Sequence, residues 1–168
     1  MASNIRITLA LLFISACAFC QQPVNMKKYT QVPAGYVMVL RQGDNLFEEL
    51  KTLARTEKIP SAHISGMGFV NITFGFFDFK KKKYDPKEFK DVELASMLGT
   101  IAWKDGDVSI HAHGVAGDKT FQTYGGHILE AQVSTGSLEI LITVHPQRFE
   151  RKRDEALGAD VLDIDPQP

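Results

Sequence analysis

Three of the five histidines in the chain lie within one short stretch, "SIHAHGVAGDKTFQTYGGHILEA" (109–131). His111 and His113 are separated by one residue, and His127 follows two consecutive glycines. In a strand, side chains two positions apart point the same way and lie about 6.5–7 Å apart along the backbone. Two imidazoles at that spacing can converge on one divalent ion, to which zinc–nitrogen bonds are about 2.0–2.1 Å long.

The third histidine completes a candidate ligand set. The glycine pair before His127 lets the chain bend and approach a neighbour closely, so an adjacent strand can bring this side chain beside the first two. Three histidines with an open fourth position are typical of a catalytic zinc site. We therefore predict a divalent metal, zinc, on His111, His113 and His127, although nickel, iron and copper also accept imidazole. Since only neutral imidazole binds metal, binding should weaken as the pH falls through about 6.5.

The alternative interpretation of the same residues needs no metal. A His-x-His pair also occurs where two polar side chains lie on the solvated face of a strand. His63 and His145, at the expected start and end of other strands, have no such neighbours in the sequence and are interpreted as ordinary polar residues.

Residues 1–20 have the three-part pattern of a secretory signal peptide. Arg6 precedes an apolar run over 7–14 that is too short to span a bilayer, and small residues follow as far as Cys20. Cleavage before Cys17 would leave a lipidated N-terminus, whereas cleavage after Cys20 would release a soluble form. We therefore expect an exported protein, periplasmic or secreted, that meets a membrane only through a lipid on Cys17.

Composition and charge restrict the class of partner. The chain has 168 residues, enough for one domain. Both cysteines lie in the predicted signal, so the mature domain is expected to have no disulfide and no thiolate ligand. Without residues 1–20 the chain loses Arg6 alone among its charged residues, which leaves 18 basic against 20 acidic residues. This small negative charge gives little electrostatic attraction to nucleic acid.

The pattern of apolar residues predicts one helix followed by strands. Asp44 or Asn45 can cap a helix that runs to about Lys58, where Pro60 ends it. Short alternating or apolar segments separated by turn residues predict strands and hairpins. The predicted strands are Tyr36–Leu40, Ala62–Ser65, Asn71–Phe79, Val92–Trp103, Val108–Val115, His127–Ser134 and Leu138–Val144.

These elements predict a single α+β domain with a mostly antiparallel sheet of about seven strands and one main helix. The domain is expected over 35–146, after a polar lead-in at 21–34. Residues 147–168 are expected to form a charged tail that completes the domain, with one short helical turn. "STGS" (134–137) is predicted to be a turn between two strands.

The chain resembles the PPC domain, which occurs in plants and prokaryotes. The resemblance covers about 36–164 and rests on ordered landmarks: Gly43-Asp44 before the helix, Gly66-x-Gly68, Glu93 ahead of "SMLGTIA", the His-x-His pair and Gly-Gly-His. It implies a compact α+β domain that associates as a homotrimer and whose three histidines hold a metal. It also marks Glu93 as a candidate catalytic acid or base beside the metal. Alternation from His127 places Glu130 on the opposite face of its strand.

The PPC family is often labelled DNA-binding because of its plant members. This sequence has no AT-hook "RGRP", is slightly acidic and begins with the predicted signal, so we do not predict nucleic acid as its partner and assign no nucleic-acid-binding residues. Two functions remain open. One is an exported metal-binding domain that binds or transforms a small molecule, with enzyme activity undecided; the other is an oligomeric interaction module.

The aromatic strand "NITFGFFDF" independently favours association. Phe74 and Phe76 should point to one face of the strand, and Phe77 and Phe79 to the other. A single helix can cover one face of the sheet, which would leave aromatic surface on the second face for another subunit. Closed symmetry then predicts a dimer or a small ring, and the family resemblance selects the trimer.

Overall fold

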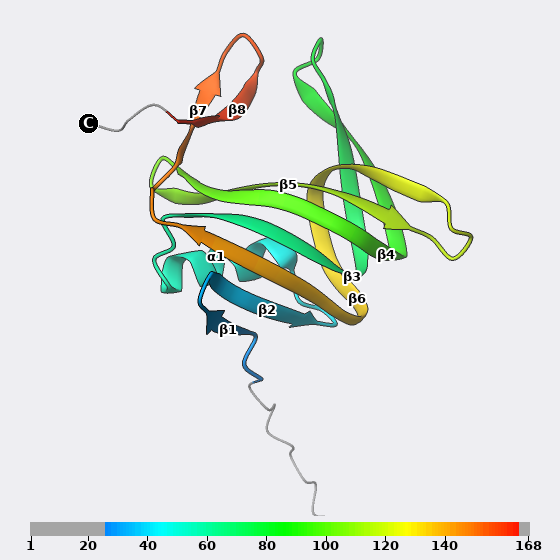
Figure 1. The fold of residues 1–168 in the computed structure, drawn as a ribbon. Helices are drawn as coiled ribbons and strands as arrows, with labels where there is room; N and C mark the ends of the chain where they lie inside the picture. The colour runs from blue at the N-terminus through cyan, green and yellow to red at the C-terminus, as the bar shows by residue number, and fades with distance from the viewer. Residues whose placement is uncertain (1–25, 165–168) are drawn as a thin grey trace, which may run out of the picture.

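One sheet carries most of the chain in the computed structural model, which describes residues 26–164 (Figure 1). The predicted signal peptide lies outside the described residues. The elements are β1 (Tyr29–Val32), β2 (Gly35–Arg41), α1 (Leu46–Thr56), β3 (Ser61–Asp78), β4 (Lys83–Lys104), β5 (Asp107–Gly117), β6 (Thr123–His145), β7 (Glu150–Asp154) and β8 (Ala159–Asp163). No helix among the described residues is long and apolar enough to cross a membrane.

The strand pairings form a closed cycle within the sheet. The strand order is β1-β2-β6-β3-β4-β7-β8, and β5 pairs with both β4 and β6. Because β3 also pairs with β4 and β6, the strands β3, β4, β5 and β6 each contact two others of the four. All these pairings are antiparallel, and the one parallel pairing joins Trp103 of β4 to Glu150 of β7. The predicted α+β class with a mostly antiparallel sheet is confirmed.

Two of the long strands were predicted as separate short ones. β3 covers the predicted strand 62–65 and the predicted strand 71–79 as far as Asp78, and β6 covers both 127–134 and 138–144. The predicted turn at 134–137 is wrong: the register between β3 and β6 shifts there, between Gly68 and Val70. A Cβ on Gly68 would overlap the carbonyl oxygen of Ser137, so this glycine lets the two strands stay together through the irregularity.

The two ends of the domain hold more structure than predicted. The lead-in at 21–34 contributes β1, whose Tyr29 ring packs edge-on against Tyr36 of β2. The predicted helical turn in 147–168 is wrong, because residues 150–163 form the β7–β8 hairpin. In Figure 1 this hairpin and the far end of the β3–β4 hairpin project on the same side of the molecule, away from β1 and β2.

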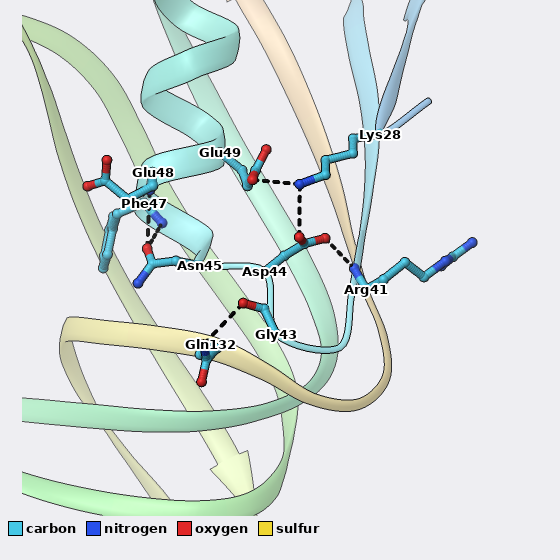
Figure 2. Close-up of polar contacts among 9 residues, drawn as sticks. All are labelled: Lys28, Arg41, Gly43, Asp44, Asn45, Phe47, Glu48, Glu49 and Gln132. Atoms are coloured by element: carbon cyan, nitrogen blue, oxygen red, sulfur yellow. Dashed lines mark hydrogen bonds and ion pairs between the residues drawn. The ribbon is translucent and has the colours of Figure 1, made fainter. Parts of the chain in front are cut away.

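The helix α1 begins where the sequence predicted, with Asn45 as its N-cap. The Asn45 side-chain oxygen accepts hydrogen bonds from the backbone N–H groups of Phe47 and Glu48 at 3.0 and 3.2 Å (Figure 2). These bonds satisfy two of the donors that the first turn of a helix leaves free. Acidic residues in the first turn and Arg55 in the last also suit the helix dipole.

The loop before α1 is fixed by its own charged residue. Asp44 accepts a bond from the backbone N–H of Arg41 at 2.8 Å and an ion pair from Lys28 at 2.8 Å. Lys28 also reaches Glu49 on α1, at 2.6 Å. One lysine before β1 therefore ties together the loop and the helix.

The buried face of α1 packs on β5 and β6. Leu46, Leu50 and Leu53 of α1 share one core with Ala112 of β5 and Ile128 of β6. Since side chains alternate along β5, burial of Ala112 against the helix leaves the residues on either side of it pointing to the outer face of the sheet.

The N-cap gives a stability prediction. We expect Asn45→Ala to lower the free energy of unfolding by about 1 kcal/mol, because two backbone N–H groups lose their acceptor. Asn45→Asp keeps an acceptor oxygen beside the helix N-terminus and should leave stability nearly unchanged. Urea unfolding followed by circular dichroism at pH 7 measures both variants. An equal decrease in the free energy of unfolding in the two variants would contradict the assignment of Asn45 as the N-cap.

Candidate metal centre

The three predicted histidine ligands meet on the outer face of β5 and β6. His113 lies directly opposite His127 in the antiparallel register, and His111 lies two residues earlier on the same face of β5. Their candidate ligand nitrogens all lie within 4.8 Å of one another. The structure therefore confirms that the three side chains come together, as the spacing and the glycine pair predicted.

The geometry of the histidine group fits a metal ion. Tetrahedral coordination with bonds of about 2.0–2.1 Å places ligand nitrogens roughly 3.3–3.4 Å apart. The Nε2 atoms of His111 and His113 are 3.1 Å apart, close to that spacing. The buried Nδ1 of His127 has no hydrogen-bond partner among the described residues, so no protein hydrogen bond fixes this ring nitrogen. A bound ion would hold the three rings in the observed convergence.

The glycines before His127 allow the close approach of β6 to β5. Gly125 pairs with Val115, and a Cβ on Gly125 would lie 2.7 Å from the carbonyl oxygen of Gly114. Any side chain there would push the strands apart. The register that places His127 opposite His113 therefore depends on glycine at position 125, two residues before His127.

Burial holds two of the histidines in their neutral, ligating form. The pKa of His111 is lowered mainly by burial, and further by the positive charges of Arg151 and of a protonated His113. The pKa of His127 is lowered to about 4, again mainly by burial, with smaller contributions from the neighbouring histidines and Arg151. Protons therefore compete with a metal ion for these two imidazoles only at a pH below the value of about 6.5 expected from the sequence.

An aromatic wall shields one side of the group. The ring of Tyr84, on β4, stacks on His127 with centroids 4.5 Å apart and planes 20° apart. Phe77 of β3 makes an edge contact with Tyr84, with ring centroids 5.0 Å apart, and contacts Phe79 at 5.1 Å. Burial raises the pKa of the Tyr84 hydroxyl, so this ring stays neutral. The wall excludes water from His127 without adding a charge.

The candidate acid or base Glu93 is not brought to the histidines within one chain. It lies on β4 opposite Gly117, four residues beyond His113 on β5, which corresponds to about 13 Å along the strand. Its side chain is exposed and does not belong to the group of potential ligands.

Glu130 does not follow the simple alternation from His127 that predicted it on the opposite face of the strand. Phe74 pairs with Ile128 and Thr73 pairs with Glu130, so Leu129 has no partner and forms a bulge. The extra residue reverses the alternation, and Glu130 is exposed instead of facing the core. It too is outside the histidine group.

Arg151, a residue of β7 that approaches the site, was not predicted from the sequence. Its side chain is only 7% exposed, and its guanidinium donates to the hydroxyl of Thr100 at 2.6 Å. Thr100 is the direct cross-strand partner of His111. In the sequence, this arginine is one of several charges in "RFERKRDE", and nothing in that run marks it as buried. His63 and His145 stay outside the group, as predicted.

Comparison with known proteins agrees with the fold and with the motifs. The model of the Plants and Prokaryotes Conserved (PCC) domain matches residues 27–146. No curated protein matches the chain. The structure resembles that of a protein from Ralstonia eutropha JMP134, named as a candidate DNA-binding protein, with 54% identity and a TM-score of 0.79 over 82% of this chain and 96% of that one.

Two archaeal structures are also similar. A plant- and prokaryote-conserved (PPC) protein from Pyrococcus horikoshii has 30% identity and a TM-score of 0.70 over 76% of this chain and 90% of that one. A protein from Archaeoglobus fulgidus described as metal-containing has 29% identity and a TM-score of 0.67 over 81% of this chain and 98% of that one. With the domain match over 27–146, these similarities show that the chain belongs to the PCC (PPC) domain family.

Proposed function

We propose that the protein binds one divalent metal ion per chain, zinc, on His111, His113 and His127, and binds a small molecule at this centre. The observation that carries the proposal is the convergence of three half-buried or exposed imidazoles from two strands on one point of the outer face. The description of the A. fulgidus relative as metal-containing supports a metal at this site.

The residues of this chain have different roles at such a centre. When bound, zinc supplies a Lewis acid that can polarise an oxygen of the small molecule. The three histidines hold the ion through neutral nitrogens, and Tyr84 excludes water from one side. Neither Glu93 nor Glu130 joins the group, so the described residues of a single chain favour binding over acid–base chemistry.

The name of the R. eutropha relative does not by itself make DNA the partner here. The chain carries a net charge of −1, and few counterions would be released on binding a duplex. Two of the four lysines at 80–83 are engaged within the chain: Lys81 pairs with Asp78 and Asp85, and Lys82 donates to the carbonyl of Glu155. We therefore propose a small molecule as the partner instead of DNA.

We also propose that the protein is a homotrimer and that it is exported through the signal at 1–20. The aromatic strand supports association in part: Phe74 is buried, Phe77 contacts the wall beside His127, and Phe76 is 80% exposed. A broader apolar surface lies on the outer face of the sheet, where large side chains from four strands are exposed: Met67, Phe69, Leu98, Val115 and Leu141. Apolar surface of this extent is typical of a protein interface.

The metal proposal predicts one ion per chain. Protein purified without a nickel column should contain about one divalent ion per chain, and His111→Ala should lower zinc affinity by more than the roughly 10–100-fold that loss of an outer-shell partner costs. His63→Ala is the matched control, because His63 is exposed and outside the group. Elemental analysis and zinc titration measure both variants. A metal-free protein whose zinc binding is the same in both variants would refute the proposal.

The shielding of His127 predicts its titration in the metal-free protein. NMR of the imidazole should give a pKa of about 4, because burial disfavours the charged ring. Tyr84→Ala exposes this ring, so its pKa should rise toward 6.5, and zinc should be lost at a higher pH than from the wild type. Phe76→Ala removes an exposed aromatic of β3 and should change neither value. An unperturbed pKa in the wild type would contradict the assignment.

The trimer predicts a mass and its sensitivity to mutation. Light scattering after size exclusion of residues 21–168 should give three times the monomer mass. Leu141→Asp combined with Met67→Asp should dissociate the assembly, since burial of each apolar side chain contributes roughly 1.5–3 kcal/mol. Leu157→Asp, in the β7–β8 turn away from that surface, should leave the mass unchanged. A wild-type monomer at micromolar concentration would rule out the trimer.

A further inference from the structure

We infer that Arg151 forms an anion subsite beside the three histidines, and that the molecule bound there is a small carboxylate that faces both the metal and the guanidinium. This inference rests on the proposed metal function and names the class of its ligand. Arg151 belongs to the β7–β8 hairpin, which lies beyond the residues 27–146 that the family model matches.

Position is the first support for the subsite. The backbone of β7 joins β4 at the pairing of Trp103 with Glu150, and the side chain of the next residue, Arg151, reaches Thr100 of β4 through a hydrogen bond. Directly opposed residues of paired strands have Cβ atoms about 4.5–5.5 Å apart, so Thr100 and His111 are immediate neighbours. The guanidinium therefore lies one side chain away from a metal ligand.

The second support is a buried charge that the described chain leaves incompletely paired. Arg151 is 7% exposed, and its Nε is buried with no hydrogen-bond partner in the described residues. Its one side-chain hydrogen bond there goes to the neutral hydroxyl of Thr100. A buried cation without a compensating anion is costly, so an arginine in this state indicates that a ligand completes its pairing.

The acidic residue Asp160 on β8 influences Arg151 through its charge but forms no ion pair with it. Its Oδ2 pairs with Lys104 at 2.7 Å, and its buried Oδ1 lies 3.6 Å from Arg153 and accepts no hydrogen bond from the described residues. Among residues 26–164, no carboxylate comes within 4.0 Å of the Arg151 guanidinium to form an ion pair.

The surroundings select a small planar anion. A guanidinium offers N–H groups in a fixed planar fork that matches the two oxygens of a carboxylate. The stacked ring of Tyr84 gives the site a flat, uncharged wall, whereas the exposed His113 leaves it open to solvent. The β3–β4 and β7–β8 hairpins that carry the wall and Arg151 are joined by the bond from Lys82 Nζ to the carbonyl of Glu155, at 2.7 Å.

Cobalt-loaded full-length protein provides the test, because the visible absorption of Co²⁺ reports a change of its ligands. Acetate should change the spectrum of the wild type, and acetamide, its uncharged analogue, should not. Arg151→Gln should weaken acetate binding by about tenfold or more, since a charge-assisted hydrogen bond is lost. The acetate affinity of Arg151→Lys should lie between those of the wild type and Arg151→Gln. Lys152→Gln removes the same charge from the adjacent, more exposed position and should bind acetate like the wild type.

The outcomes separate this inference from the metal proposal. If the wild type does not bind cobalt, the metal function and the subsite both fail. If cobalt binds equally to all variants but Arg151→Gln binds acetate as tightly as the wild type does, the subsite alone is overturned. Tighter binding of inorganic phosphate than of acetate would overturn the carboxylate class. Should Arg151→Gln not fold, Thr100→Val, which removes the hydroxyl that orients the guanidinium, must weaken acetate binding in the same direction.

Discussion

The pairing of β5 with both β4 and β6 is the constraint on which the rest of the site depends. It closes the cycle of strands and fixes the register in which His113 faces His127. A shift by one residue would turn the histidines of β5 into the core and its alanines outward, because side chains alternate along a strand. The small side chain of Ala112 beneath α1 and the glycines before His127 make this register the one that packs without collision.

The two faces of this closed part of the sheet have opposite roles. The inner face is filled by apolar side chains of α1 and the strands, which supply the stability of the domain. The outer face carries the histidines, the aromatic wall with Tyr84, and the buried Arg151. Burial on this face does not pack a core; it keeps two imidazoles neutral and leaves one guanidinium short of partners.

The family relationship and the tail account for different parts of the site. The residues that the domain model matches, 27–146, include all three histidines and the wall. The β7–β8 hairpin lies beyond that range and adds Arg151, whose contact with Thr100 joins it to the shared part. Arg151 comes near the histidines because β7 pairs with β4 at Trp103 and Glu150, and the arginine side chain reaches Thr100, the cross-strand partner of His111.

The sequence by itself predicted the fold class, restricted the helix cap to Asp44 or Asn45, and predicted that the three histidines converge. Each of these depends on local chemistry: an acceptor at Asn45, alternation along a strand, and two imidazoles one residue apart followed by Gly-Gly-His. Two of its failures came where alternation is interrupted. The bulge at Leu129 reversed the face of Glu130, and the irregularity opposite Gly68 joined two predicted strands into β6.

Only the tertiary structure decided which distant residues share the site. Glu93 lies too far along β4, although the family resemblance marked it as a candidate acid or base beside the metal. Arg151 lies 24 residues after His127 in the numbering, and its burial results from the return of β7 onto β4. A charged residue in a charged run gives no local sign of burial. The burial of a side chain depends on the residues that pack over it. For Arg151 these are brought together by the pairing of β7 with β4, two strands far apart in the chain.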